Sequence, residues 1–444
     1  MATSLVTATP GATIAIDYPQ PYVLYQRDAD GKGDVRIRGT LTGVTEPCRV
    51  EARFSEGPWQ TLDAATEEGR FAGTIVGLTG QGRVEVRRAG QSEPVTSVEP
   101  VAVGDLFLVT GQSNADGRGS VNVTLAETNP FVGVKYQGDT WSRGDDPSDN
   151  SGKHASPWPI VLNELIPEQK VPMGFVQAAV GSTVVRQWRK GGSYYERAMK
   201  VLHSATDGSM AVKAVLYYQG ENDITHHNHL SVLGDYQQYK THLIAMADDF
   251  HNDLKAPVLI GQITNLGPGR SRNDGVRQAQ QEIWSECPHA LPGAVTYDIL
   301  PTDGVHYRDA ANMKAFAGRW SYAIRNALYT KSPQRPPQLV AAKRTANTDL
   351  QLTYDRTLNV SDWQGRASDR PAGFRVVAGD VSLGDTDISS TSVSGKTVLL
   401  RFSKPVPAAA RFFYGSGNDA QNKPVLRDAA TGQPVPLQYD VPIK

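Results

Sequence analysis

The chain lacks a charge imbalance, long apolar runs and a set of cysteines. Its 45 Lys and Arg residues nearly balance 46 Asp and Glu residues, so the formal net charge is −1. That charge gives no general field to attract nucleic acid or an anionic membrane surface. No run approaches the roughly 18 apolar residues that cross a bilayer. The two cysteines, Cys48 and Cys287, lie far apart in the sequence, and a disulfide framework is not expected.

The first residues also lack a signal-peptide pattern. Met1 to Thr7 contain no basic region followed by an apolar core. A secreted protein written without its signal would begin in the same way, so these residues leave the compartment open, with a secreted or periplasmic location favoured.

Length and composition indicate a globular protein of more than one domain. At 444 residues the chain is too long for one ordinary hydrophobic core. With 39% hydrophobic and 20% charged residues it does not have the composition of a disordered chain. Two or three domains are expected.

The periodicity of apolar residues divides the chain into three parts. Up to residue 103, short runs such as 35–38, 49–54 and 83–88 alternate apolar and polar residues, which predicts a small antiparallel β domain with one face in water. After the proline-rich linker 332–337, alternating runs return, and residues 338–444 are predicted to form a second β domain.

The central part, residues 104–331, has a different pattern. Four-to-seven-residue apolar runs alternate with segments of helical period, which predicts a parallel sheet covered by helices on both faces. The predicted strands are 106–109, 174–179, 212–218, 257–261 and 294–300. The predicted helices are 194–205, 231–254, 274–286 and 309–329. The polar segment 138–152 is expected to be an irregular surface loop.

The first of these strands ends abruptly in Gly111-Gln112-Ser113-Asn114. Ser113 would therefore lie at the carboxyl end of a buried strand, where ligands and chemistry collect in open α/β sheets. The simpler interpretation is a helix cap, for which Ser and Asn are preferred residues. The remaining strand ends decide between the two.

Polar residues follow three further strands of the predicted sheet. Together with the segment after the first strand, this gives four polar segments: Gly111–Asn114, Ala179–Thr183, Tyr217–Asp223 and Asp303–Tyr307. Because the carboxyl ends of parallel strands share one edge of a sheet, these side chains are expected to converge. A helix cap does not require such partners, so the convergence favours chemistry at Ser113.

Together the four segments supply what acyl transfer needs. A Ser hydroxyl requires a base, the base requires an orienting acid, and the oxyanion requires positioned donors. Ser113 is the candidate nucleophile and His306 the candidate base. Asp303, three residues before His306, is close enough to orient it. The oxyanion donors would be the N–H groups of Ser113 and Gly181 and a side-chain amide.

The same segments resemble the SGNH (GDSL-like) hydrolases, and within them the carbohydrate esterases of the sialate O-acetylesterase and family 6 acetylxylan esterase type. The resembling blocks are Gly111–Gly119, Ala179–Trp188, Tyr218–Asp223 and Asp303–His306. This resemblance implies an α/β fold with a flavodoxin-like, three-layer parallel sheet, flanked by small N-terminal and C-terminal β-sandwich-like domains. It implies removal of acetyl groups from a carbohydrate through an acyl-enzyme, without a cofactor or metal.

Two positions depart from the family pattern. Ala115 stands where many relatives have Met. The third block reads Gln-Gly-Glu, whereas the wider superfamily has an Asn that donates to the oxyanion. The amide is therefore assigned to Gln219, with Asn222 as the fallback. Further candidates for substrate binding are Gln112, Trp188, Arg189, Glu221, His226 and His227. Of these, Trp188 fits core packing equally well, and Glu221 fits a structural role better.

Other chemistries are less consistent with these residues. An α/β-hydrolase needs Gly-x-Ser-x-Gly, and Ala115 occupies the last position of that pattern. The run His226-His227-Asn228-His229 invites a metal, but adjacent histidines diverge and no carboxylate or Cys pair accompanies them, which favours a solvated loop.

Two competing functions are left open. A lipase for longer acyl chains would need an apolar trough, whereas the segments 138–152 and 222–229 are polar. A carbohydrate-binding protein with a decayed esterase site would have no reason to retain Ser, Asp and His together. We therefore expect an acetylated carbohydrate as partner, and neither nucleic acid nor a membrane. The sequence does not indicate an oligomeric state.

Overall fold

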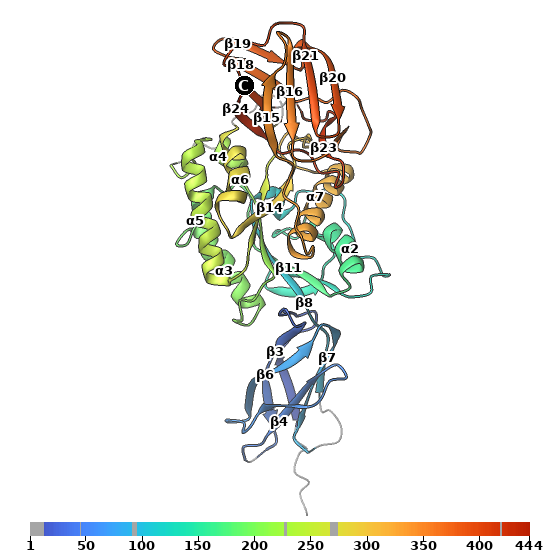
Figure 1. Ribbon diagram of the computed structural model, residues 1–444. Coiled ribbons are helices and arrows are strands. Elements are labelled where there is room, and N and C mark those ends of the chain that lie inside the picture. Colours follow the sequence, from blue (N-terminus) through green and yellow to red (C-terminus); the bar gives the residue numbers. More distant parts are fainter. Residues whose placement is uncertain (1–12, 45, 91–95, 226–228, 267–273, 418–419) are drawn as a thin grey trace, which may run out of the picture.

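The computed structural model describes residues 13–44, 46–90, 96–225, 229–266, 274–417 and 420–444. Three successive parts of the chain lie one after another along the long axis of the molecule: a β-rich part, an α/β part and a second β-rich part (Figure 1). None of the helices in these ranges is long and apolar enough to span a membrane.

The N-terminal part consists of strands that pair mainly antiparallel, in two sheets that share one core with the central part. The strands are β1 (Thr13–Tyr18), β2 (Leu24–Gln26), β3 (Lys32–Thr42), β4 (Val50–Phe54), β5 (Gln60–Asp63), β6 (Arg70–Leu78) and β7 (Gly80–Arg88). The predicted runs 35–38, 49–54 and 83–88 form strands of this part. Residues of β3 alternate between more exposed and buried positions, which confirms the prediction of one solvent-exposed sheet face.

The central sheet has a parallel core in the order β11-β8-β12-β13-β14. In chain order this is 2-1-3-4-5, the flavodoxin-like order. Strand β9 adds to the β11 edge in parallel, and β10 pairs antiparallel with β9, so the complete sheet is mixed. The strands are β8 (Thr96–Gly111), β9 (Gly133–Gln137), β10 (Thr140–Arg143), β11 (Met173–Gln177), β12 (Ala214–Tyr218), β13 (Val258–Gln262) and β14 (Ala290–Val295).

Helices cover both faces of this sheet. In Figure 1, α3, α5 and α6 lie on one side, and α2 and α7 on the other. The helices are α1 (Ser113–Asp116), α2 (Trp158–Gln169), the 3-10 helix η1 (Val185–Trp188), α3 (Ser193–Ala205), α4 (Glu221–Thr225), α5 (Tyr236–Leu254), α6 (Gly275–Glu286) and α7 (Ala310–Leu328). The four predicted helices are present, although α5 begins five residues after the predicted start at 231.

Several elements differ from the sequence-based expectation: β8 begins before the predicted strand, β9 was not predicted, and three others need a physical explanation. Helix α2 was not predicted, because its two prolines, Pro159 and Pro167, mask a helix that is buried along much of its length. Strand β14 begins at Ala290 and ends at Val295, so the prediction of 294–300 was about four residues late. Pro292 and Gly293 argued against a strand there, but β14 is an edge strand, where proline is tolerated. The segment 138–152 contains β10, and its Ser148 and Asp149 are buried.

A buried carboxylate on β8 joins the N-terminal and central parts. Strand β8 runs without interruption from the pairing with β7 into the central sheet. Asp105, fully buried on this strand, accepts hydrogen bonds from Arg27 at 2.8 and 2.9 Å and from the Tyr329 hydroxyl at 2.7 Å, with Lys213 at 3.7 Å. Burial alone would raise the pKa of Asp105, but these partners hold it below its usual value.

A second buried carboxylate joins the central and C-terminal parts. Asp298, just after β14, lies 2.9 Å from the Arg319 guanidinium of α7 and 2.5 Å from that of Arg427 in the C-terminal part. All three side chains are buried. Burial opposes ionisation of Asp298, and the two guanidinium groups outweigh it, so that the pKa is lowered. Removing one member of such a buried group typically costs about 3–5 kcal/mol.

The C-terminal part has a hydrophobic core of its own, which extends to Val295 and Tyr297 of the central part. It follows the linker 332–337, which has no helix or strand. Its strands form three sheets, β15-β16-β21-β20, β17-β23 and β19-β18-β22-β24. They are β15 (Leu339–Arg344), β16 (Asp349–Tyr354), β17 (Leu358–Ser361), β18 (Phe374–Ala378), β19 (Val381–Gly384), β20 (Ile388–Ser394), β21 (Thr397–Phe402), β22 (Arg411–Tyr414), β23 (Val425–Asp428) and β24 (Gln438–Pro442), with the 3-10 helix η2 (Asp385–Asp387).

Candidate active site

Strand β8 ends in a turn that only glycine can form. Gly111 has a φ of +108°, and a Cβ there would lie 2.1 Å from the carbonyl oxygen of Tyr218 on the neighbouring strand. The chain then enters α1, a four-residue helix that begins at Ser113. Gln112, not Ser113 or Asn114, occupies the cap position of this helix, and its side chain makes no capping bond. The simple capping interpretation of Ser113 therefore does not hold.

Ser113 faces an imidazole and a carboxylate from the far end of the domain. The Oγ of Ser113 lies 3.0 Å from Nε2 of His306, and Nδ1 of His306 lies 3.0 Å from Oδ2 of Asp303. Ser113 is 6% exposed, whereas Asp303 and His306 lie on a more open loop between β14 and α7. The structure thus brings together the three residues that the sequence suggested as nucleophile, base and orienting acid.

Burial and hydrogen bonds together set the ionisation states of Asp303 and His306. Burial would raise the pKa of Asp303, but bonds from the His306 ring, from the backbone N–H groups of His306 and Val305 and from Arg308 hold it far below its usual value. Burial lowers the pKa of His306 below its ordinary value of 6.5, and the neighbouring Asp303 offsets only part of this effect. At neutral pH the pair is therefore a carboxylate next to a neutral imidazole, which can accept a proton.

Gly181 follows β11 and lies beside the nucleophile turn. A Cβ built on it would be 3.6 Å from Cβ of Ser113 and 2.6 Å from Nη2 of Arg118. The close guanidinium leaves little room for a larger residue at position 181. Among the hydrogen bonds of the described residues, none is donated by the Gly181 N–H, so this group is available to a ligand.

The structure separates the two candidate amides of the third block. Gln219 is fully buried, and its Nε2 donates to Thr183 O at 2.9 Å and to Asp223 Oδ2 at 2.8 Å. Its Oε1 accepts from the Tyr217 hydroxyl at 2.9 Å. Gln219 is thus committed to the interior, which corrects its assignment as an oxyanion donor. The Nδ2 of Asn222 is buried and has no acceptor within the described part of the chain.

Asn114 connects three of the four blocks. Its Nδ2 donates to Glu221 Oε1 at 2.8 Å and to Val305 O at 3.0 Å, and its Oδ1 accepts from the Tyr307 N–H at 3.4 Å. Both bonds to the last block flank His306 in the sequence. The side chain of Asn114 therefore holds the loop that carries His306 against the turn that carries Ser113.

Glu221 has a buried carboxyl group that is only half satisfied. It is 2% exposed, and its Oε2 has no hydrogen-bond partner among the described residues. Burial raises the pKa of Glu221 to about 7, against an ordinary value of 4.5. A side chain in this position supports Asn114 and does not reach a substrate, in agreement with the structural interpretation.

The other substrate-binding candidates are largely not at an open surface. Trp188 is fully buried, stacks on Tyr194, and donates from Nε1 to the Thr183 hydroxyl at 2.9 Å. Gln112 is 1% exposed and accepts from Gln219. A sugar cannot reach either side chain, so the prediction that Trp188 and Gln112 bind the substrate is corrected. Arg189 is partly buried against His242. His226 and His227 lie outside the described residues.

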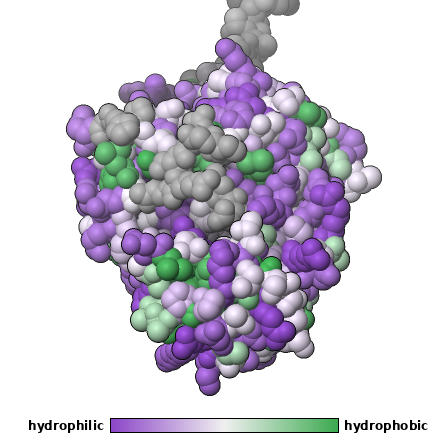
Figure 2. Space-filling model, turned by 90° about the horizontal axis from the view of Figure 1, so that it is seen from above, coloured by the Kyte–Doolittle hydropathy of each residue, from purple (hydrophilic) through white to green (hydrophobic). Residues whose placement is uncertain are grey.

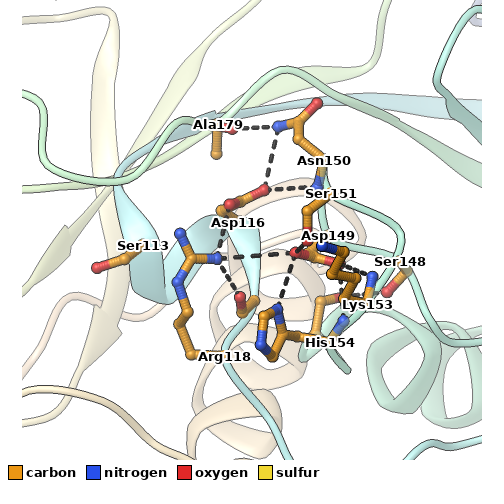
Figure 3. A network of polar contacts seen from close by, with 12 residues as sticks. Ser113, Asp116, Arg118, Ser148, Asp149, Asn150, Ser151, Lys153, His154 and Ala179 are labelled. Carbon is orange, nitrogen blue, oxygen red and sulfur yellow. Dashed lines mark hydrogen bonds and ion pairs between the residues drawn. The ribbon is translucent and has the colours of Figure 1, made fainter.

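A polar network beside Ser113 was missed by the sequence analysis (Figure 3). Arg118, 23% exposed, donates to Asp116 Oδ2 at 2.7 Å and lies 4.0 Å from Asp149 Oδ2. Asn150 donates to Asp116, and His154 Nδ1 lies 3.1 Å from Asp149 Oδ2. Bonds from Ser151, Lys153 and His154 outweigh burial and lower the pKa of Asp149 to about 2. The density of Asp, Asn and Ser in 145–151 was the available signal.

The described ranges contain no cluster of three or more His, Cys, Asp or Glu side chains that could hold a metal ion. Of the histidine run 226–229, only His229 lies within those ranges.

Comparison with known proteins relates this arrangement to a family. Residues 103–317 match the family described as carbohydrate esterase, sialic acid-specific acetylesterase. This part of the chain is therefore similar to a carbohydrate esterase domain. A probable carbohydrate esterase of Arabidopsis thaliana is 26% identical, over 43% of this chain and 79% of that protein. The esterase family and its relatives identify the chain as a carboxylic ester hydrolase and confirm the resemblance inferred from the four blocks.

The fold of the esterase also has a counterpart over nearly the whole chain. The crystal structure of a carbohydrate acetylesterase from Xanthomonas citri covers 94% of this chain and 97% of its own, with a TM-score of 0.63 and 18% identity. At this identity the likeness concerns the fold. It includes the two β-rich parts as well as the esterase domain.

The buried carboxyl of Glu221 gives a stability prediction. In the unfolded chain this group loses its proton near pH 4.5, but in the folded chain only near 7. Folding stability is therefore lost as the pH rises from about 4.5 to 7 and stays lower above that window. Glu221→Gln removes the titration and keeps the acceptor for Asn114. We expect the variant to gain up to about 3 kcal/mol over the wild type between pH 4.5 and 8.

Urea unfolding of both proteins at pH 4.5 and pH 8 measures this difference. The matched control is Glu56→Gln, because Glu56 is exposed. An equal difference between Glu221→Gln and wild type at the two pH values would contradict the assignment of a protonated Glu221.

Proposed function

We propose that this esterase removes acetyl groups from carbohydrate hydroxyls through a covalent intermediate on Ser113. The observation that carries the proposal is the chain of contacts from Ser113 Oγ to His306 to Asp303, at 3.0 Å each, at the carboxyl edge of the sheet of a carbohydrate esterase domain. The sequence relatives, a carbohydrate esterase family and a probable carbohydrate esterase, support the class of substrate.

In the first half of the proposed reaction, Ser113 attacks the acetyl carbonyl carbon. Nε2 of His306 removes the Ser113 proton as the new C–O bond forms. Asp303, bonded to Nδ1, holds the ring in the tautomer that leaves Nε2 free and stabilises the imidazolium. When the tetrahedral intermediate collapses, the bond to the sugar oxygen breaks and His306 returns the proton to that oxygen. The sugar leaves with a free hydroxyl.

In the second half, water attacks the acetyl-serine. His306 now accepts the proton of the water, and the collapse of the second intermediate breaks the bond to Ser113 Oγ. The proton returns to Ser113, and acetate leaves. The lowered pKa of His306 favours both proton transfers at neutral pH, because the imidazole is neutral before each attack.

The oxyanion of both intermediates needs donors that are not already bonded. The N–H groups of Ser113 and Gly181 are two of the proposed donors, as the sequence suggested. For the third we choose Asn222 over Gln219, because Nδ2 of Asn222 is unpaired among the described residues and that of Gln219 is bonded three times. An unpaired buried amide is costly unless a ligand uses it.

Longer acyl chains fit the surroundings of Ser113 less well. The partly exposed side chain beside Gly181 and Ser113 is the guanidinium of Arg118, which is polar. In Figure 2, the described residues on the face seen from above are mostly hydrophilic, and the hydrophobic ones form separate small groups. Comparison of acetyl, butyryl and octanoyl esters distinguishes an acetylesterase from a lipase: the acetyl ester should have the highest kcat/KM.

We further propose that the esterase domain spans residues 104–331, between β-sandwich-like domains at 1–103 and 338–444. Separate cores support this division for the C-terminal part. On the N-terminal side the core is continuous, so the boundary there divides one strand, β8, between two domains.

The first prediction concerns the nucleophile. Ser113→Ala removes the attacking oxygen and is expected to lower kcat/KM for p-nitrophenyl acetate by about 10⁴-fold or more. The same variant should release no acetate from acetylated xylan, acetylated pectin or O-acetylated sialic acid, of which the wild type should hydrolyse at least one. Ser332→Ala, in the exposed linker, is the control. Wild-type rates in Ser113→Ala would refute the acyl-enzyme.

The second prediction concerns pH. Because burial lowers the pKa of His306, wild-type kcat/KM should fall on the acid side with a midpoint below 6.5, where the imidazole becomes protonated. Asp303→Asn removes the charge that favours the imidazolium, so the midpoint should move to lower pH while the rate at pH 8 drops. A midpoint that moves upward in Asp303→Asn would contradict this role.

The third prediction concerns the oxyanion. Asn222→Ala should lower kcat about 10²- to 10³-fold with little change in KM, because the lost bond forms only in the transition state. Thermal unfolding should change little. An unchanged kcat in Asn222→Ala would exclude this amide as a donor.

A further inference from the structure

A shallow cavity lies where the C-terminal part meets the loop that carries Asp303 and His306. Its volume is about 340 Å³, within the roughly 300–1,000 Å³ range of small-ligand sites. The central part contributes residues 300–302, 309, 311 and 312, and the C-terminal part contributes Trp363, Gln364 and Asn422. Ligand sites occur preferentially at such junctions.

The loop that carries Asp303 and His306 also borders this cavity. Thr302, which lines the cavity, directly precedes Asp303. Its backbone N–H donates to the carbonyl oxygen of His306 at 2.9 Å. The candidate active site and the cavity are therefore linked through one loop.

The aromatic wall of the cavity is rigid. Trp363 is partly exposed and packs against the core of the central part. Its Nε1 donates to the Asn422 Oδ1 at 2.9 Å, which fixes the orientation of the indole ring. A fixed, partly exposed indole offers apolar contact area at little cost in side-chain entropy. The C–H groups of a sugar ring can stack on such a surface.

Asn312, which also lines the cavity, has a buried hydrogen-bond acceptor that no described residue satisfies. Asn312 is 6% exposed, and its Nδ2 donates to Leu300 O, to Thr302 Oγ1 and to Asp309 Oδ2, each at 3.0–3.1 Å. These bonds settle which end of the amide is the oxygen. No described residue donates to the remaining Oδ1, and a hydroxyl group is a suitable donor.

The charges of the lining residues restrict the ligand further. The polar side chains are those of Thr302, Asp309, Asn312, Gln364 and Asn422, and the lining includes neither Lys nor Arg. With a carboxylate and no cation, the cavity disfavours an anionic sugar. Hydroxyl-rich, uncharged sugars match its amides, its hydroxyl and its indole.

From these contacts we infer that the cavity is a subsite for a neutral sugar unit, next to the unit whose acetyl group is removed. The inference rests on the proposed carbohydrate esterase function and specifies its substrate as an oligomer or polymer. The C-terminal part thus contributes to substrate selection through Trp363.

The test compares short and long substrates of the same sugar. Partially acetylated xylose and xylotetraose form one series, and partially acetylated glucose and cellotetraose the other. Wild-type kcat/KM should be higher for the tetraose than for the monosaccharide in at least one series. Trp363→Ala should reduce that preference about three- to tenfold, through KM. Trp363→Tyr should retain part of it.

Two further variants protect the test from effects on folding. Gln364 is exposed, so Gln364→Ala removes a cavity amide without disturbing the core and should also reduce the preference. Trp59→Ala, a tryptophan of the N-terminal part held between Arg53 and Arg87, should leave the preference unchanged.

Calorimetry with unacetylated xylotetraose and cellotetraose measures sugar binding at the cavity independently of ester hydrolysis. The tighter-binding tetraose should bind Trp363→Ala at least threefold more weakly than the wild type. Equal kcat/KM for monosaccharide and tetraose in both series, or equal binding by wild type and both cavity variants, would overturn the inference. Failure of the wild type to hydrolyse even p-nitrophenyl acetate, with tetraose binding intact, would instead count against the proposed function.

Discussion

Parallel hydrogen bonding along β8 is the constraint on which the candidate site depends. This strand pairs with β11 on one side and β12 on the other, so the segments that leave all three strands must emerge together. The carbonyl of Gly111 accepts from Val180, one residue before Gly181, and the N–H of Gln112 donates to Tyr218, one residue before Gln219. The positions of Ser113, Gly181 and the third block are therefore consequences of sheet register, and a shift of one residue in either pairing would separate them.

Only the last block is not placed by this register. Its strand, β14, is two strands away from β12, and His306 reaches Ser113 on a long loop. Asn114 closes that gap, because one side chain bonds the backbone on both sides of His306. Local bonds then set the state of each ionisable group. Asp303 stays charged because several donors surround it, whereas Glu221, equally close to the site but with one oxygen unpaired, is held nearer to neutral. Because their environments differ, the carboxylate of Asp303 can orient His306 while the carboxyl group of Glu221 supports Asn114.

The sequence predicted the features that depend on the periodicity of apolar residues and on the order of segments along the chain. Apolar runs predicted β11, β12 and β13 within a few residues, and only the last part of β8. Polar residues at the strand ends predicted Ser113, Gly181, Asp303 and His306 as site residues. The sequence could not predict which amide is free, because two partners of Gln219, Gln112 and Thr183, come from other blocks. Trp188 shows the same limit: its burial depends on Tyr194 and Tyr217. The network around Arg118 was missed because segment 145–151 has no periodicity and acquires its order only from contacts with α1.

The two buried carboxylates, Asp105 and Asp298, bear on how this protein changes over evolutionary time. Each pairs with one cation of the central part and one of an outer part: Asp105 with Lys213 and Arg27, and Asp298 with Arg319 and Arg427. Loss of either outer part would remove one cation from a buried carboxylate, at a typical cost of about 3–5 kcal/mol. The outer parts are therefore poor candidates for exchange by recombination, and the three are expected to be inherited as one unit.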